Sequence, residues 1–212
     1  MVEVLPGILE HTFSGVAEKV SRLQGIVERV QLDVADGVFV PEKTWNEPDD
    51  LSKIESNMLF DIHLMVDRPE KVCEAWNISS VFRITFHFEA TYDVRRTAGL
   101  VSSFGKKVGL ALNPETPIES VYDVIDGIDV VLIMGVAPGA QGRAFDPKVV
   151  DKVRALREHD EHIAIGVDGG VTPIVSDTLI SSGANMLVSG SYLFGCSDIM
   201  EGMKTLRGGR EI

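Results

Sequence analysis

The chain alternates short apolar runs with longer amphipathic segments almost from end to end. This alternation is typical of repeated strand and helix units that build a parallel sheet, because such strands are buried on both faces. The pattern predicts about eight strands, the number that closes a (β/α) barrel. The predicted strands lie near residues 2–8, 29–34, 58–66, 81–87, 107–113, 129–134, 164–167 and 185–189.

Prolines near the start of several amphipathic segments indicate where helices begin, since proline fits the first helical turn. Helices are expected to start at Pro69, Pro117 and Pro147, and a last helix is expected over residues 198–206. An open doubly wound sheet is the competing architecture, but it needs a glycine fingerprint after the first strand, which residues 6–10 do not supply. The expected fold class is therefore α/β, a (β/α)8 TIM barrel.

Composition limits the domain organisation and the partners. The 212 residues contain no linker-like or low-complexity stretch, so residues 1–212 are expected to form a single domain. A net charge of −12 argues against nucleic acid and against membrane surfaces as partners. Cys73 and Cys196 lack zinc-type spacing, and the N-terminus lacks the pattern of a signal peptide. A cytoplasmic protein is expected; a homo-oligomer is possible, with no stoichiometry indicated.

The period of two along a strand predicts which side chains share the barrel interior. If strand ends converge at one mouth, this interior carries acids, imidazoles and sulfur together. The inward groups are expected to be Gln31 and Asp33 in the second strand, Asp61, His63 and Met65 in the third, Thr85, His87 and Glu89 in the fourth, and Leu132 and Met134 in the sixth.

Two predicted strands end in an aspartate that is followed directly or closely by glycine. Asp33 ends the run before Gly37, and Asp168 precedes Gly169. Each aspartate alone is more often a helix cap or a turn residue. Together, at the C-terminal ends of parallel strands, they are candidates for an acid/base pair that faces one substrate from two sides.

Glycine-rich turns follow three predicted strands, at residues 134–145, 168–170 and 189–191. Glycine lets backbone N–H groups turn toward an anion, and TIM barrels often bind phosphate near the last strands. Each turn alone is weak evidence. Three turns at strand ends indicate a phosphate site, which reconciles an acidic protein with an anionic substrate.

Other polar clusters favour structural roles. His63 lies in an apolar run, where a lone histidine is more often a core residue, and His87 with Glu89 more often hydrogen-bonds structurally. The segment 158–162 resembles a set of metal ligands, but it joins a helix to a strand and so belongs at the opposite face of the barrel.

With these motifs placed, the chain resembles the ribulose-phosphate 3-epimerase family from the first strand to the last. Several motifs match in the same order. The matching stretches are LDVADGVFVP (residues 32–41), FDIHLMV (60–66), TFHFEA (85–90), VGLALNP (108–114), VAPG (136–139), VDGGV (167–171) and GANMLVSGS (183–191).

The resemblance implies a barrel that interconverts D-ribulose 5-phosphate and D-xylulose 5-phosphate with a bound divalent metal ion of unspecified identity. It implies that one aspartate removes the proton at C3 and the other returns a proton to the opposite face. The positions that carry over are Asp33 and Asp168 as catalytic residues and metal ligands, His63 as a third ligand that also contacts substrate, Gln31 as a doubtful fourth ligand, Met65 and Met134 as site-lining residues, and Gly139, Ala140, Gln141, Gly142, Gly169, Gly170, Gly190 and Ser191 as the phosphate-binding turns.

The departures from the family pattern fall in the site itself. Gln31 replaces a histidine ligand, Gly7 replaces a serine in the turn of the first strand, and Ala35 replaces a methionine. Glutamine offers a metal a neutral carbonyl oxygen, which suits magnesium or manganese better than zinc or iron. In the altered phosphate loop, Gln141 narrows the approach to phosphate and Arg143 can supply compensating charge.

Three functions remain open at this point. The leading hypothesis is an epimerase-like isomerase that acts on a small ketose phosphate through an enediolate. A related decarboxylase of sugar-acid phosphates is an alternative that would use Asp33 and Asp36, although Asp36 is more often a turn residue. A non-catalytic paralogue that binds a phosphorylated sugar is the third, motivated by the changes at positions 31 and 7.

Overall fold

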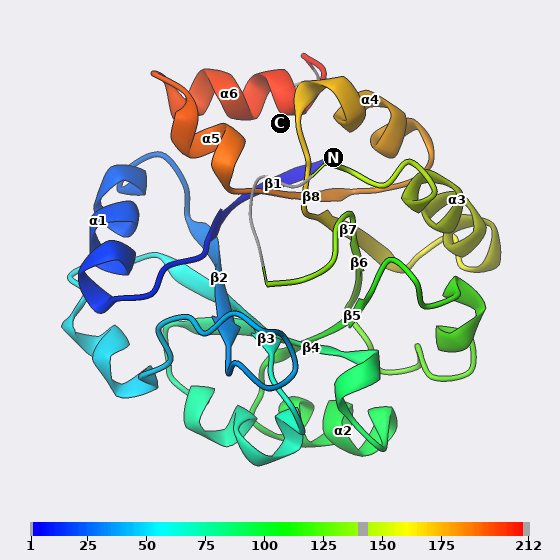
Figure 1. The fold of residues 1–212 in the computed structure, drawn as a ribbon, viewed down its shortest axis with the longest axis horizontal. Coiled ribbons are helices and arrows are strands. Elements are labelled where there is room, and N and C mark those ends of the chain that lie inside the picture. Colours follow the sequence, from blue (N-terminus) through cyan, green and yellow to red (C-terminus); the bar gives the residue numbers. More distant parts are fainter. Residues whose placement is uncertain (1, 140–143, 210–212) are drawn as a thin grey trace.

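A computed structural model of the protein describes residues 2–139 and 144–209. Eight parallel strands pair in chain order, and β8 pairs with β1, so the sheet closes into a barrel with the helices around its outside (Figure 1). The predicted (β/α)8 TIM barrel is confirmed. The strands are β1 (Glu3–Ile8), β2 (Arg29–Ala35), β3 (Leu59–Met65), β4 (Val81–His87), β5 (Lys107–Leu112), β6 (Val130–Met134), β7 (Ala164–Asp168) and β8 (Met186–Ser189).

The connections between strands contain both α-helices and short 3-10 helices. The α-helices are α1 (Phe13–Leu23), α2 (Val94–Ser103), α3 (Val149–His159), α4 (Pro173–Ser181), α5 (Ser191–Gly195) and α6 (Ile199–Leu206). The 3-10 helices are η1 (Pro48–Lys53), η2 (Pro69–Lys71), η3 (Cys73–Trp76), η4 (Phe88–Ala90) and η5 (Ile118–Val121).

The prediction of helices was accurate at Pro147 and over residues 198–206, and wrong in type at Pro69 and Pro117. Those two prolines introduce 3-10 turns only. The chain must return from the end of β3 to the start of β4 within residues 66–80. A 3-10 turn rises about 2.0 Å per residue and an α-helix about 1.5 Å. A connection with 3-10 turns therefore covers the same return distance along the outside of the barrel with fewer residues.

The buried apolar residues of the described part of the chain form one large cluster and two smaller ones. A large cluster fills the space between strands and helices, and a smaller one fills part of the barrel interior, where Leu5, Leu132 and Met186 meet. Helix α1 illustrates the outer layer: Thr12 caps its first turn, and its buried residues Val16 and Val20 face the sheet. Alternation along the strands thus separates an outer apolar layer from an inner face, part of which carries polar groups.

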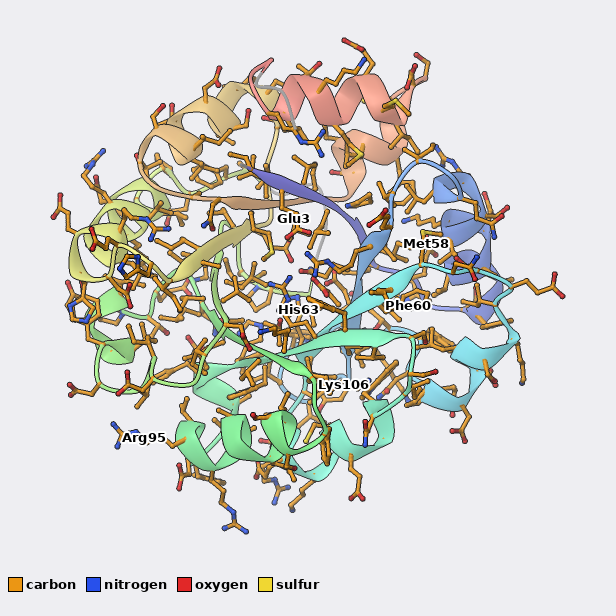
Figure 2. The ribbon with its side chains drawn as sticks, turned by 180° about the vertical axis from the view of Figure 1, so that it is seen from behind. Glu3, Met58, Phe60, His63, Arg95 and Lys106 are labelled. Carbon is orange, nitrogen blue, oxygen red and sulfur yellow. The ribbon has the colours of Figure 1, made fainter. Side chains whose placement is uncertain are left out.

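The third strand shows this division along its inward side. Asp61, His63 and Met65 are all buried, as the period of two predicted. Asp61 lies near the N-terminal end of the strand, with its Oδ2 2.8 Å from Arg83 Nη2. His63 lies near the middle of the barrel, whereas Arg95 points outward at its rim (Figure 2). Within the described residues, no helix is long and apolar enough to cross a membrane.

Candidate active site

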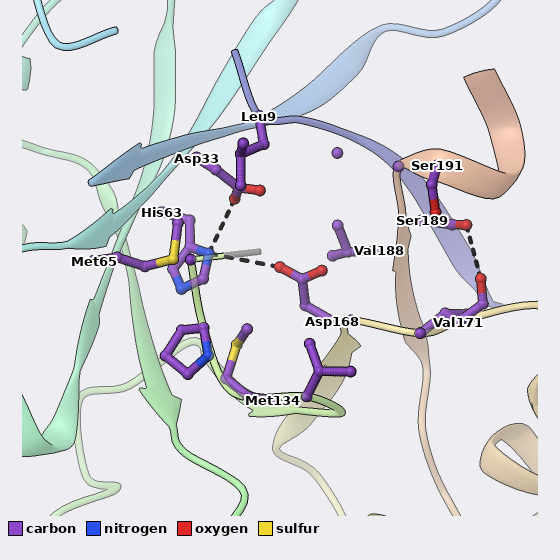
Figure 3. A pocket seen from close by; sticks show the side chains of 17 residues that line it. Leu9, Asp33, His63, Met65, Met134, Asp168, Val171, Val188, Ser189 and Ser191 are labelled. Atoms are coloured by element: carbon purple, nitrogen blue, oxygen red, sulfur yellow. Dashed lines mark hydrogen bonds and ion pairs between the residues drawn. The ribbon is translucent and has the colours of Figure 1, made fainter. Parts of the chain in front are cut away.

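A pocket that is partly open to solvent lies at the mouth where the strands end. Acids, an imidazole and two thioethers line it together with several glycine turns (Figure 3). The residues that line it include Gly7, Asp33, His63, Met65, Met134, Gly139, Asp168, Gly169, Gly170, Gly190 and Ser191.

Three ionisable side chains converge at the base of this pocket. Asp33 and His63 are paired in the register of β2 and β3, and Asp168 ends β7. The Nδ1 atom of His63 lies 3.1 Å from Asp33 Oδ1 and 3.5 Å from Asp168 Oδ2 (Figure 3). One ligand atom from each residue lies within 4.8 Å of the other two, the arrangement of a candidate metal site. Barrel closure thus brings together the residues that the sequence analysis selected.

Gln31 lies among these three side chains. Its Nε2 donates to Asp33 Oδ1 at 2.8 Å and to Asp168 Oδ2 at 2.6 Å, and it lies 3.4 Å from His63 Nδ1. The nitrogen faces the acids because ionised carboxylates only accept hydrogen bonds. The residue that departs from the family pattern therefore joins the two aspartates through one neutral amide.

The electrostatics of the site depend on burial and on two neighbouring acids. Burial, and then the charge of Asp33, raise the pKa of Asp168 to about 7. For His63, burial opposes protonation, but the hydrogen bond and charge of Asp33 together with the charge of Asp168 raise the pKa above its usual value. The pocket therefore holds a carboxyl that exchanges a proton near neutral pH.

The other nitrogen of His63 contacts a second histidine. His63 Nε2 lies 2.9 Å from His87 Nε2, and the two rings lie nearly edge to edge, with 5.0 Å between centroids and 23° between planes. Burial lowers the pKa of His87 to about 4, although the contact with Glu89 at 3.4 Å opposes this, so His87 is neutral at neutral pH. The alternation along β4 predicted that His87 points inward; its contact with His63 required the tertiary structure.

The apolar wall and the first strand refine two sequence predictions. Met65 and Met134 line the pocket as expected, and Ala35 packs with Val40 and Met65 in a small cluster. Gly7 lies within β1, paired with Gln31, rather than in a turn after that strand. Pro6 precedes Gly7 and is itself paired with Ser189 of β8, so the strand continues through both residues.

The glycine turns at the ends of β7 and β8 border the pocket. Gly169 has a φ of 98° and Gly170 a φ of 68°, values that favour glycine. A Cβ on Gly170 would lie 3.0 Å from the backbone of Phe145. Gly139, Gly190 and Ser191 also line the pocket, whereas Ala140, Gln141, Gly142 and Arg143 lie outside the described residues.

Thr44 supports the site, and no sequence pattern indicated it. Its hydroxyl donates to the carbonyl of Asp33 at 2.9 Å and accepts from the N–H of Ala35 at 2.8 Å. The loop after β2 is thereby attached to the strand end that carries Asp33. The sequence around Thr44 gave no signal of this contact, because both partners of the hydroxyl are backbone groups.

Two other candidates lie elsewhere. The carboxylate of Asp36 accepts from the N–H groups of Val38, Phe39 and Asp67 at 2.8–2.9 Å, so it organises a turn. The decarboxylase alternative thereby loses the feature that motivated it. In the segment 158–162, His159 stacks on Tyr122 at 3.7 Å, at the end of α3 and away from the pocket lining.

Comparisons with known proteins identify the family of the chain. The model of the ribulose-phosphate 3 epimerase family matches residues 3–194. Ribulose-phosphate 3-epimerase from Bacillus subtilis is 33% identical, with 99% of this chain and 100% of that protein covered. The chloroplastic ribulose-5-phosphate-3-epimerase from Arabidopsis thaliana is 35% identical, with 96% of this chain and 75% of that protein covered.

Solved structures show the same architecture at low sequence identity. A 3-hexulose-6-phosphate synthase superposes with a TM-score of 0.67 at 15% identity, with both chains fully covered. A tryptophan synthase alpha-subunit from Pyrococcus furiosus has a TM-score of 0.71 at 13% identity, covering 98% of this chain and 100% of that one. These likenesses concern the fold alone. The family match and the identity to named epimerases establish that this chain belongs to the ribulose-phosphate 3-epimerase family.

Proposed function

We propose that the protein epimerises a pentulose 5-phosphate at C3, interconverting D-ribulose 5-phosphate and D-xylulose 5-phosphate. The observation that carries this proposal is the position of Asp33 and Asp168, which enter one pocket from β2 and β7 on either side of His63. Inversion at carbon requires a proton to leave one face and a proton to arrive at the other. Two carboxyl groups on separate strands meet this requirement.

The proton transfer follows from this arrangement. One aspartate accepts the C3 proton, which the adjacent ketone acidifies, and the other donates a proton to the opposite face of the resulting enediolate. Asp168, whose pKa is raised to about 7, exchanges protons readily at neutral pH. Because the reaction is reversible, the two acids exchange roles with its direction. Met65 and Met134 line the same pocket and limit water around the reacting carbon.

The residues at the base of the pocket fit a divalent cation. Two carboxylates and an imidazole nitrogen face one another within 4.8 Å, and the carboxylates are joined only by a neutral amide. Asp33, His63 and Asp168 would hold the ion. Gln31 would offer its carbonyl oxygen in place of a second imidazole once its amide, whose nitrogen now faces the acids, turned over. When bound, such an ion supplies positive charge that stabilises the enediolate oxygen. The oxygen-rich donor set favours magnesium or manganese over zinc.

The phosphate group of the substrate would bind at the glycine turns. None of the described residues that line the pocket is lysine or arginine. Recognition would therefore rely on backbone N–H groups at Gly170, Gly190 and Ser191, which approach a ligand closely because two of them lack side chains. A phosphate at this end would place the ketose carbons toward Asp33 and His63.

The test is exchange of the C3 hydrogen in heavy water. The protein, loaded in turn with magnesium, manganese or zinc, is mixed with D-ribulose 5-phosphate, and incorporation of deuterium at C3 is followed by NMR. Incorporation with formation of xylulose 5-phosphate is expected. If no metal supports exchange at C3, the proposal fails.

A non-catalytic paralogue that binds a phosphorylated sugar is the second candidate, because the Gln31 amide already joins the acids that a metal would join. Calorimetry that finds tight sugar-phosphate binding without turnover would favour it. The double variant Gln31→His and Gly7→Ser restores the family residues. A Cβ at position 7 would lie 3.1 Å from Val188 Cγ1, so a serine needs only a small shift there. Epimerisation that appears only in this variant would identify these changes as the cause of inactivity.

A further inference from the structure

A chain of polar contacts extends from the candidate metal site into the protein. His63 Nδ1 faces the two aspartates, and its Nε2 lies 2.9 Å from His87 Nε2. On the far side, His87 Nδ1 lies 3.4 Å from Glu89 Oε2. Both imidazoles are 0–1% exposed, so water does not replace either contact. The chain therefore links Glu89 to the metal-facing nitrogen of His63.

The hydrogen positions in this chain follow from its ends. The other carboxylate oxygen of Glu89, Oε1, accepts from the N–H of Asn113 at 2.8 Å and from the hydroxyl of Thr116. Oε2 thus remains as an acceptor toward His87 Nδ1. No hydrogen bond of ordinary geometry reaches His87 Nδ1 or the buried Oδ1 of Asn113 among the described residues, so Glu89 Oε2, at 3.4 Å, is the nearest ion-pair partner of this imidazole nitrogen. Acceptors on this side require that His87 carries its hydrogen on Nδ1.

A neutral imidazole has one hydrogen, so His87 Nε2 must then be an acceptor. The short contact between the two Nε2 atoms has room for a single hydrogen, which must belong to His63. The Nε2 hydrogen of His63 is thus donated to His87. Nδ1 faces Asp33 and Asp168, which accept hydrogen bonds, so in the metal-free protein it also carries a hydrogen, which a bound cation would displace. The ring of Phe39 packs against the second imidazole, 4.9 Å from its centroid and tilted by 49°.

We propose that His87 and Glu89 are positioning residues that keep the hydrogen of His63 on Nε2 and so leave Nδ1 available as a ligand for the divalent cation. The proposal deepens the proposed function, on whose metal site it rests. Outer hydrogen-bond partners of this kind set the tautomer of a ligand histidine, and their loss typically costs about 10–100-fold in metal affinity.

Replacement of Glu89 by glutamine and by alanine separates this role from a merely structural one. In Glu89→Gln, the two donors Asn113 N–H and Thr116 O–H retain the amide oxygen, so the amide nitrogen turns toward His87 Nδ1. A donor at that place reverses both hydrogen bonds and leaves the hydrogen of His63 on Nδ1 alone. Alanine removes the acceptor without supplying a donor. A structural role predicts that glutamine is the milder change; the tautomer role predicts that it is the more harmful one.

The same reasoning distinguishes two variants of His87. In His87→Gln, the amide oxygen lies where Nε2 was and still accepts from His63, whereas His87→Leu has no acceptor. Glu70→Gln is the matched control, because Glu70 accepts a hydrogen bond from the Thr91 hydroxyl and, within the described residues, has no hydrogen bond or ion pair with either histidine. Circular dichroism and melting temperature confirm that each variant is folded before binding is measured.

The experiment measures Mn²⁺ affinity by calorimetry and the position of the hydrogens by ¹⁵N NMR of histidine-labelled, metal-free protein. We expect Glu89→Gln and His87→Leu to weaken Mn²⁺ binding about 10–100-fold, with smaller effects of Glu89→Ala and His87→Gln and no effect of Glu70→Gln. In the wild type, the shared hydrogen should be bonded to His63 Nε2, and in Glu89→Gln to His87 Nε2.

A hydrogen on His87 Nε2 in the wild type, Mn²⁺ binding by Glu89→Gln as tight as that of the wild type, or a wild type that binds no divalent ion would each overturn the proposal. The NMR and calorimetric measurements need no turnover. If they give the expected results while no pentulose phosphate exchanges its C3 hydrogen, the epimerase function fails and the positioning role stands.

Discussion

Replacement of Gln31 by methionine tests how the two aspartates coexist in the metal-free protein. Methionine has a similar length and no hydrogen-bond donor, so the change removes the amide that joins Asp33 Oδ1 and Asp168 Oδ2. Hydrogen bonds to charged groups contribute about 1.5–3 kcal/mol each, so two of them amount to about 3–6 kcal/mol. When the amide is absent, Asp168 can take up a proton instead. The expected loss in the free energy of unfolding is therefore near the lower end of this range, about 3 kcal/mol.

The sign of the pH dependence follows from the pKa of Asp168. Its folded pKa is raised from 3.8 to about 7, so its contribution to stability is present below about pH 4 and is lost as the pH rises through 7. The hydrogen bond from Gln31 lowers this pKa, so its removal raises the pKa further. The variant should therefore be most destabilised, relative to the wild type, above pH 7, and the difference should shrink as the pH falls below 7.

The assay is equilibrium unfolding in urea with EDTA present, followed by circular dichroism at about pH 8.5 and about pH 6. Gln24→Met is the control, because the Gln24 side chain donates to a backbone carbonyl of Glu55 in an exposed place and should change stability by less than about 0.5 kcal/mol. A loss below about 1 kcal/mol for Gln31→Met at the higher pH, or an equal loss at both values, would refute the reasoning.

Three further predictions concern the pocket. Asp33→Asn and Asp168→Asn should each slow C3 hydrogen exchange at least about 10²–10⁴-fold while the circular dichroism spectrum is retained; exchange at the wild-type rate in either variant would contradict the two-acid assignment. Gly170→Ala should destabilise the protein by at least about 1 kcal/mol, because φ is 68° and the new Cβ would lie 3.0 Å from the backbone of Phe145. It should also raise KM more than it lowers kcat, and an unchanged melting temperature would count against this prediction. Mn²⁺ at about 100 times its Kd should stabilise the wild type by about 2.7 kcal/mol, and His63→Leu should abolish this gain in thermal melts with and without EDTA.

The fold was largely predictable from local pattern. Buried strands that alternate with amphipathic segments leave few ways to cover both faces of a parallel sheet, and the eight predicted strands agree with the observed ones within two residues at each end. The errors were in connections: Pro69 and Pro117 begin 3-10 turns, because the length of the return path across the barrel, rather than local helix propensity, decides which helix forms there.

The candidate residues were also predictable, but their relations were not. Alternation along β2 and β3 indicated by itself that Gln31, Asp33 and His63 point inward, and the motifs indicated Asp168. Only closure of the barrel brought the Gln31 amide within 2.6 Å of a carboxylate 137 positions away and set His87 against His63. Chain pattern fixes the direction of a side chain relative to its own strand. Which atoms then meet, and which nitrogen of His63 faces the acids, depends on strand register and on partners from other strands, information that local sequence does not contain.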